Sequence, residues 1–195
     1  MSYELDTITE NCYPETSVLI NKLDIRDETI LNEAEAITVA TKSALWENDP
    51  LENAFDFKHY KAIHQYLFED LYEWAGQPRV INISKKGTLF CAFENIEAQA
   101  ELIFSRLKDR DMFVNLKRSE FVKEIVDFYC VTNFLHPFRD GNGRAQRIFI
   151  TQLIHNAGYS FDFADADGDL LMIATIHSAH GVTDLLIELF DELVK

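Results

Sequence analysis

Apolar residues recur every three or four positions along most of the chain, with polar residues between them. This spacing is typical of amphipathic helices that pack on a common core. It predicts helices over Asp27–Leu45, Phe57–Trp74, Glu94–Lys108, Ser119–Leu135, Asn142–Asn156, Gly168–Ser178 and Val182–Val194. The pattern therefore indicates a bundle of helices.

One stretch departs from the helical period. It runs from Gln77 to Phe93 and reads QPRVINISKKGTLFCAF, with alternating and β-branched residues on both sides of Lys86 and Gly87. Such a pattern is typical of a short β-hairpin. A two-stranded hairpin is only marginally stable alone, so this one is expected to lie on the helices. The predicted fold class is all-α, a helical bundle with one short β-hairpin.

The length and composition fit a single domain over residues 1–195. A chain that is 47% hydrophobic can bury a core without disulfides or a structural metal, and no repeat or low-complexity tract marks a linker. The three cysteines are scattered without a CxxC pair, which suits a reducing cytoplasm. We find no leader and no apolar run of about 18 residues, so we expect a soluble cytoplasmic protein without a membrane partner.

The overall charge argues against direct nucleic-acid binding. With 18 basic and 33 acidic residues the net charge is -15, which leaves no broad cationic surface for a polyanion. Arg139, Arg144 and Arg147 are the local exception, because they fall within nine residues of each other. A small cationic spot in an acidic protein indicates a bound anion.

The arginines belong to the segment HPFRDGNGR, which begins at His136 and is followed by Arg147. Pro137 disfavours a helical conformation in His136, so the preceding helix is expected to stop there. Gly141 and Gly143 allow the backbone to approach a ligand closely. Asn142 is expected to cap the next helix.

The start of that next helix has the features of a phosphate site. Its free N–H groups, its dipole and two arginines three residues apart, Arg144 and Arg147, together form an anion cradle. Asp140 at the rim suits a Mg²⁺ ion that bridges phosphates. With His136 as a base, the segment predicts phosphoryl or nucleotidyl transfer. A structural turn with His, Asp and Asn as caps would leave the arginine cluster unexplained.

Two histidine pairs elsewhere are candidate metal ligands by their spacing. His59 and His64 are five residues apart and His177 and His180 are three apart, without an HExxH context or a third ligand. They are interpreted as exposed or capping histidines rather than as a metal site.

The segment from His136 to Arg147 matches the HPFx[D/E]GNGRxxR signature of the Fic family, which the chain resembles. Ile63–Arg79, reading IHQYLFEDLYEWAGQPR, resembles the helix and WAG segment before the family's flap hairpin, and NISKKGTLFCAF resembles the flap. The resemblance covers a core of about residues 57–195. Pro14–Ile25 resembles the lead-in of toxin-type members, within an N-terminal helical extension of about residues 14–50.

The resemblance implies a protein adenylyltransferase, a nucleotidyltransferase that moves AMP from ATP to a Tyr, Thr or Ser hydroxyl of a target protein. His136 would be the general base, and Asp140 would hold Mg²⁺. The nucleotide phosphates would be bound by the backbone of Gly141 and Gly143 and by Asn142, Arg144 and Arg147. Here Arg144 would contact the β-phosphate and Arg147 the γ-phosphate. The flap residues Ile83, Ser84, Lys85, Lys86, Gly87 and Thr88 would pair with an extended target segment.

Two alternatives remain open beside AMP transfer. One is a Doc-like protein phosphotransferase, although Doc-type members carry a Lys where this chain has Gly143. The other is a Fic fold that binds nucleotide without transferring anything, although such members would be expected to lose His136 or an arginine.

Fic enzymes are commonly inhibited by a helix that reads [S/T]xxxE[G/N]. The string from Ser43 to Asn48 matches these letters, with Glu47 as the candidate inhibitory acid, but Leu45 and Trp46 look like core residues of their helix. The preferred hypothesis is that a separate small antitoxin supplies the inhibitory helix, as in toxin-type relatives. The same relatives suggest a DNA topoisomerase subunit as the target.

Overall fold

The computed structural model describes residues 10–48, 54–85 and 88–195. The α-helices of this part are α1 (Glu28–Asn48), α2 (Phe57–Phe68), α3 (Ile96–Asp109), α4 (Arg118–Leu135), α5 (Asn142–Asn156), α6 (Gly168–Ser178) and α7 (Asp184–Leu193). Two short strands, β1 (Ser84–Lys85) and β2 (Thr88–Leu89), pair antiparallel, with Ser84 opposite Leu89 and Lys85 opposite Thr88. The all-α fold with one β-hairpin is confirmed.

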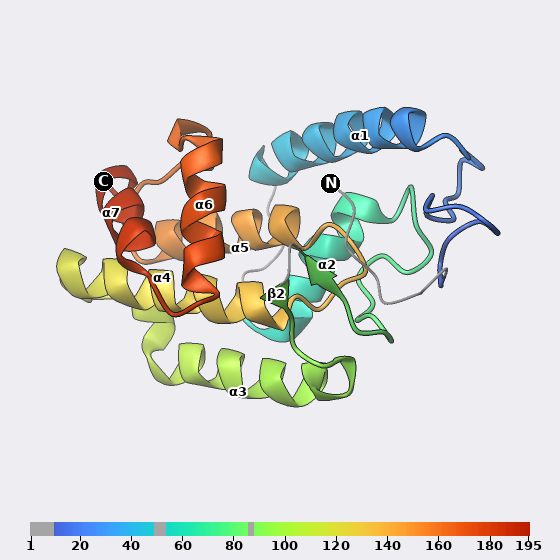
Figure 1. Cartoon of the computed structure of the whole chain (residues 1–195). Helices are drawn as coiled ribbons and strands as arrows, with labels where there is room; N and C mark the ends of the chain where they lie inside the picture. The colour runs from blue at the N-terminus through green and yellow to red at the C-terminus, as the bar shows by residue number, and fades with distance from the viewer. Residues whose placement is uncertain (1–9, 49–53, 86–87) are drawn as a thin grey trace.

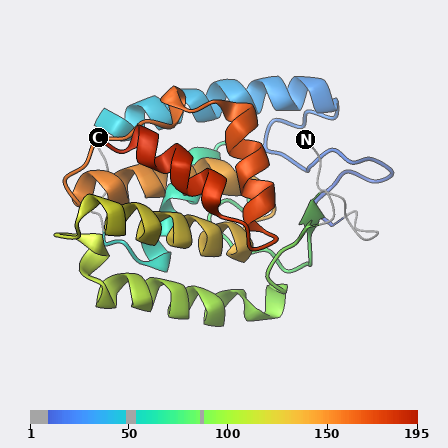
Figure 2. The same ribbon diagram turned by 60° about the vertical axis from the view of Figure 1, so that its left-hand side comes forward.

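The helices form a bundle in which α5 is central. Helix α5 packs on α2 and α4, α3 packs on α4, and α1 packs on α2. Figure 1 shows α1 along one edge of the bundle and α3 along the opposite edge, with α4 and α5 between them. Helix α7 lies against both α4 and α6 (Figure 2). The start of α5 is thus enclosed by elements from both halves of the chain.

The middle of the core is an aromatic cluster around Phe149 of α5, a side chain that is only 1% exposed. Its ring lies edge-on to those of Tyr60 and Phe104, at 5.4 and 5.5 Å between centroids, and is stacked on that of Phe128 at 5.8 Å. Aromatic rings favour such edge-on and offset contacts. The cluster joins α2, α3 and α4 to α5 and fixes the position of the central helix.

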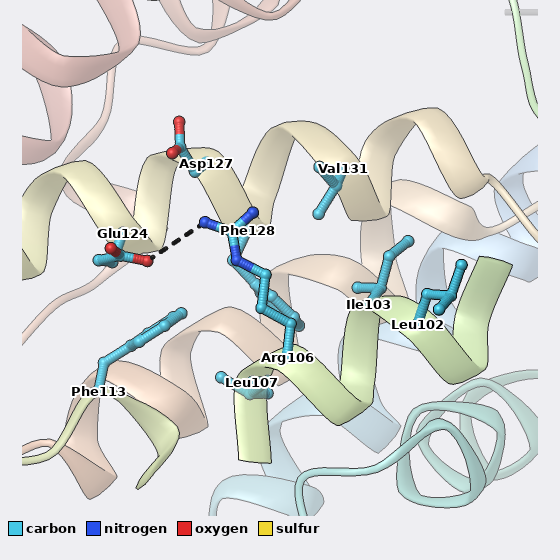
Figure 3. A pocket seen from close by; sticks show the side chains of 9 residues that line it. All are labelled: Leu102, Ile103, Arg106, Leu107, Phe113, Glu124, Asp127, Phe128 and Val131. Carbon is cyan, nitrogen blue, oxygen red and sulfur yellow. Dashed lines mark ion pairs between the residues drawn. The ribbon is translucent and has the colours of Figure 1, made fainter. Parts of the chain in front are cut away.

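Helix α3 covers α4 incompletely. Between the two helices lies a shallow cavity of about 200 Å³ with an apolar floor that includes Leu107, Phe113 and Phe128. Figure 3 shows Arg106 reaching across it toward Glu124, and this ion pair spans 3.7 Å. The cavity shares no lining residue with the candidate site described below.

The predicted bounds of α5 and α6 agree with the structure, but the second predicted helix is too long. Helix α2 ends at Phe68 rather than at Trp74, and the chain continues through turns to Gly76. Gly76 has a φ of +76°, and a Cβ there would lie 2.7 Å from the Cβ of Gln65. Only glycine therefore lets this turn fold back against α2.

The hairpin is also shorter than the stretch from Gln77 to Phe93 that was predicted for it. Each strand has two residues, and the flanking segments are irregular. The guanidinium of Arg79 donates to the carbonyls of Ile81 and Cys91 at 2.6 and 2.5 Å. These carbonyls are therefore occupied by a side chain instead of extending the ladder. None of the described helices combines the length and hydropathy that a bilayer crossing requires.

Candidate active site

The side chain of Asn142 holds the loop between α4 and α5 together by hydrogen bonds to the backbone of the loop. The amide of Asn142 accepts a hydrogen bond from the N–H of Phe138 and donates one to the carbonyl of the same residue, both at 2.8 Å. The Phe138 ring is fully buried and stacks on His64. The expectation that Asn142 caps α5 is wrong, because Gly141 is the N-cap residue and Asn142 is the first residue of the helix.

His136 lies where α4 ends, as Pro137 predicts. Its φ of +41° is outside the helical region. Nδ1 of the imidazole lies 3.0 Å from the carbonyl oxygen of Asn133, and the ring stacks on Phe90 with 3.7 Å between centroids. Because a carbonyl can only accept, Nδ1 carries the hydrogen and Nε2 is the proton acceptor.

Burial keeps this imidazole neutral. The His136 side chain is almost fully buried, and desolvation lowers its pKa to about 3. The hydrogen bond to Asn133 opposes the decrease, while the nearby cations Lys85 and Arg79 add to it. At neutral pH the ring is therefore unprotonated and able to accept a proton.

Arg79 ties the hairpin to this loop. Its Nε donates to the carbonyl of His136 at 2.9 Å, and its backbone N–H donates to the carbonyl of Pro137 at 2.8 Å. Its Nη1 and Nη2 donate to the carbonyls of Ile81 and Cys91 on the two sides of the hairpin. The buried Arg79 thus sets the hairpin against His136, a role that sequence reasoning did not foresee.

The predicted phosphate-binding residues meet in one cavity of about 590 Å³ at the start of α5. Its lining includes Asp140, Gly141, Asn142, Gly143, Arg144 and Arg147. Gly141 has a φ of +78°, and its missing Cβ leaves space for the ring of Phe68. The helix dipole, backbone N–H groups and two guanidinium groups give this cavity the character of an anion site.

The two arginines differ in their surroundings. Arg144 lies over the ring of Phe68, with its Cζ 4.7 Å from the ring centroid. Arg147 is exposed at the surface, but partial desolvation of its guanidinium lowers its pKa from the ordinary value, Tyr129 opposes the decrease, and the proximity of Arg144 adds to it. Two cations held this close together favour a ligand of high negative charge.

A second cavity of about 270 Å³ adjoins the first, and Lys85, Gly143 and Arg147 line both. The rest of its lining includes Thr88, Phe90, His136, Leu171, Met172 and Thr175. Helix α6 thus contributes an apolar wall to a space that also contains the candidate base. An anion site with an apolar space beside it fits a ligand with phosphate groups at one end and an aromatic ring at the other.

The predicted flap residues are only partly at this site. Lys85 lines both cavities and Thr88 lines the second, whereas Ile83 is buried and Ser84 is half-buried. Lys86 and Gly87 lie outside the described residues.

Asp140 is the acidic residue of the loop. Its Oδ1 accepts the N–H of Gly141 at 2.5 Å and lies 3.5 Å from Nη2 of Arg144, and about a third of the side chain is exposed (32%). Within residues 10–48, 54–85 and 88–195 there is no group of three His, Cys, Asp or Glu side chains that could enclose a metal. A single carboxylate at the edge of a phosphate cradle fits Mg²⁺, which proteins commonly bind through one or two carboxylates and the substrate's phosphates.

Comparison with known protein families matches residues 54–154 to the Fic/DOC family. The chain belongs to this family. It is 39% identical over 173 residues to a probable protein adenylyltransferase of Sinorhizobium fredii, covering 87% of this chain and 88% of that one. It is 34% identical to the probable protein adenylyltransferase Fic of Escherichia coli, covering 94% and 90%. A crystal structure of BepC from Bartonella tribocorum with bound AMPPNP has a TM-score of 0.88 and 26% identity, covering 96% and 97%.

Two buried histidines of this Fic/DOC protein were wrongly expected to be exposed or capping. His64 accepts the N–H of Gly76 at Nδ1 and donates from Nε2 to the carbonyl of Asp140, both at 2.9 Å. Desolvation lowers its pKa to about 3. His59 is packed among Trp46, Phe55 and Phe149. The apolar spacing of α2 turns both rings into the core, and His64 positions the loop that carries Asp140.

The candidate inhibitory string lies in α1, beside the arginines. Ser43 and Trp46 line a groove of about 570 Å³ between α1 and α5, which Arg144 and Arg147 also line. The side chain of Glu47 lies outside the described part of the chain. Among the described residues, the indole N–H of Trp46 and both polar atoms of the Gln152 amide are buried without a hydrogen-bond partner.

The substitution Gly141→Ala should damage both stability and the anion site. A Cβ would lie 2.4 Å from the Phe68 ring at a φ of +78°, so strain and overpacking together should cost about 2–5 kcal/mol. Gly158→Ala is the matched control, because Gly158 has a φ of +90° and nothing within 4 Å of the added Cβ. It should lose only about 1–2 kcal/mol in urea unfolding. Equal losses would show that the Phe68 contact is unimportant.

Stability should fall in mild acid. His64 and His136 have folded pKa values of about 3, below the unfolded value near 6.5, so the unfolded chain binds more protons between these pH values. Each should lower the free energy of unfolding by up to about 1.4 kcal/mol per pH unit. Urea unfolding at pH 7, 6 and 5 measures the slope. His64→Gln should make it shallower, whereas the exposed control His180→Gln should not.

Proposed function

We propose that this protein transfers AMP from ATP to a Tyr, Thr or Ser hydroxyl of a target protein. The observation that carries the proposal is the position of the neutral His136 imidazole, whose Nε2 can accept a proton. The ring lines the second cavity, and that cavity adjoins the one that Arg144 and Arg147 line at the start of α5. Two relatives of similar length named as probable protein adenylyltransferases support it.

The triphosphate would lie in the larger cavity. Backbone N–H groups of Asn142 and Gly143 would bind the α- and β-phosphates, Arg144 the β-phosphate and Arg147 the γ-phosphate. The N–H of Gly141 is bonded to Asp140, so Gly141 would contribute to the phosphate site through its conformation. The side chain of Asn142 is committed to the loop, so its contribution to the ligand would come from the backbone. The apolar space against α6 would hold the adenosine.

Asp140 is the residue that would hold Mg²⁺ together with the phosphates. When bound, the ion neutralises charge on the phosphate oxygens. The orientation of the Asp140 carboxylate comes from the Gly141 N–H and the Arg144 guanidinium, while His64 fixes the backbone of Asp140.

In the reaction, Nε2 of His136 takes the proton of the target hydroxyl as its oxygen attacks the α-phosphorus. The new O–P bond forms as the bond to the bridging oxygen breaks, and pyrophosphate leaves with the electron pair. Burial makes the imidazolium unfavourable in the nucleotide-free protein, but the negative charge of a bound triphosphate would raise the pKa of His136 and stabilise the imidazolium as it forms.

The hairpin would present the target to this base. An extended segment can add to a short strand through main-chain hydrogen bonds. Because Arg79 links the hairpin to the carbonyl of His136, a target strand paired there would have a fixed register relative to the base.

The glycine at position 143 weighs against phosphoryl transfer. In the Doc-like alternative a Lys replaces Gly143, whereas here an added Cβ at Gly143 would meet only Nη1 of Arg147, at 3.6 Å. Glycine at this position leaves the space beside Arg147 to the nucleotide. The nonenzymatic alternative would leave the neutral His136 without a role.

We also propose the biological setting. The protein would act in the cytoplasm as the toxin of a toxin–antitoxin pair, with a DNA topoisomerase subunit as its target. Its net charge of -15 argues against direct contact with nucleic acid. An antitoxin helix in the groove between α1 and α5 could offer partners to Gln152 and Trp46, and an acid on that helix would compete with the γ-phosphate for Arg147.

Replacement of the base tests the reaction. With ATP labelled at the α-phosphate and host lysate as the source of targets, the unaltered protein should transfer label, and His136→Ala should transfer at least about a hundredfold less. ATP binding should persist in this variant, since the arginines are unchanged. Label transferred from the γ-phosphate instead would support phosphorylation, and normal transfer by His136→Ala would refute the base assignment.

The substitution Glu47→Gly tests the two-protein model of inhibition. The activity of the isolated chain should change little, because the inhibitory helix would be on the partner. Glu33→Gly, at an exposed position of the same helix, controls for the cost of glycine in α1. A large gain in transfer specific to Glu47→Gly would show that the chain inhibits itself.

A further inference from the structure

A carboxylate from α1 reaches the start of α5. Glu35 is 8% exposed, and its Oε1 lies 2.5 Å from Nη1 of Arg144. Its Oε2 accepts the hydroxyl hydrogen of Tyr72. The two residues of the ion pair are 109 positions apart in the sequence, so the contact exists only because α1 packs over this end of the bundle.

The Glu35 carboxylate is held rigidly. The Tyr72 ring is fully buried and stacks on Trp74, with 4.4 Å between centroids. Burial and the neighbouring Glu35 carboxylate raise the pKa of Tyr72, so its hydroxyl remains protonated and donates. Both oxygens of Glu35 therefore have a partner, as a buried carboxylate requires.

Arg144 is in turn held from three sides. Glu35 contacts Nη1, Asp140 lies 3.5 Å from Nη2, and the guanidinium lies over the ring of Phe68. A guanidinium has five N–H donors, and these contacts leave others available toward the cavity that Arg144 lines with Gly143 and Arg147. Arg144 can therefore bind an anion without leaving Glu35.

We propose that Glu35 is a positioning residue that holds Arg144 in the orientation that binds the β-phosphate of the nucleotide. The inference rests on the proposed nucleotide site. Glu35 lies outside residues 54–154, which match the family, so the N-terminal helix completes a site that the matched segment does not complete alone.

The geometry favours positioning over competition. A carboxylate that competed with phosphate would need to withdraw when the nucleotide arrives, whereas Glu35 is buried and hydrogen-bonded to the fully buried Tyr72. Fixing a long side chain in advance removes its conformational entropy from the free energy of binding. Glu35 also lines the cavity, but its negative charge opposes phosphate binding only weakly, because the ion pair with Arg144 balances it.

The test compares the affinities for ADP and AMP, since their ratio measures how much the β-phosphate contributes to binding. Calorimetry on the full chain in constant Mg²⁺ should show that Glu35→Ala lowers the preference for ADP roughly tenfold, as expected for a charge-assisted hydrogen bond. Glu35→Gln should retain most of it, because the amide oxygen can still accept from Arg144. Glu33→Ala, at an exposed site on α1, should change nothing.

Unchanged AMP affinity shows that the pocket is intact in each variant. If Glu35→Ala does not fold, Tyr72→Phe removes the bond that fixes Oε2 and should lower the ADP preference in the same direction. An increase in ADP preference in both Glu35 variants would identify Glu35 as a competitor and overturn the inference.

A double variant separates this inference from the proposed site. Arg144→Ala should lower the ADP preference, and adding Glu35→Ala should lower it no further, because Glu35 acts through Arg144. If Glu35 changed the ADP preference through its charge alone, Glu35→Ala would still change that preference in the Arg144→Ala background, and the inference would be overturned. No effect of Arg144→Ala itself would instead refute the assignment of Arg144 to the β-phosphate.

Discussion

The two hydrogen bonds between the Asn142 amide and the backbone of Phe138, one accepted and one donated by the side chain, are the constraint on which the site depends. They close the loop between α4 and α5 through the protein's own groups, so the start of α5 stays open to the cavity. His64 and Phe68 support the loop from α2, and the glycine at 141 is what permits their approach. An anion would therefore meet a preformed cradle and would not have to order one, which is the condition under which electrostatic stabilisation is most effective.

Two kinds of electrostatic environment lie side by side at this loop. Arg144 and Arg147 place two cationic groups at a cavity, whereas burial keeps the His136 imidazole neutral. The arrangement separates the two tasks of a transfer reaction, which are to hold a polyanion and to accept a proton. Arg79 keeps the two regions in a fixed relation to the hairpin through bonds to backbone carbonyls, which do not change with pH.

The local parts of this structure could be predicted from the sequence, and the long-range parts could not. The bounds of α5 and the end of α4 at His136 follow from periodicity and from Pro137, because both are effects within a few residues. Glu35, His64 and Arg79 were missed, since each acts on a partner 57 to 109 positions away. In the sequence, Glu35 is one of many acids on a helix, and only packing distinguishes it from Glu33. Asn142 does not have the capping role expected of it, because its amide is hydrogen-bonded to the backbone of Phe138 within the loop.

The stacking of Phe90 on His136 links the geometry of the hairpin to the basicity of the imidazole. Phe90 follows β2 directly, so the ring that shields the imidazole from water is part of the hairpin segment that borders the second cavity. A change in hairpin length or twist would alter the recognition edge and the basicity of the imidazole together. Changes that alter which partner the hairpin recognises are consequently restricted to side-chain replacements that leave the backbone path of this segment unchanged.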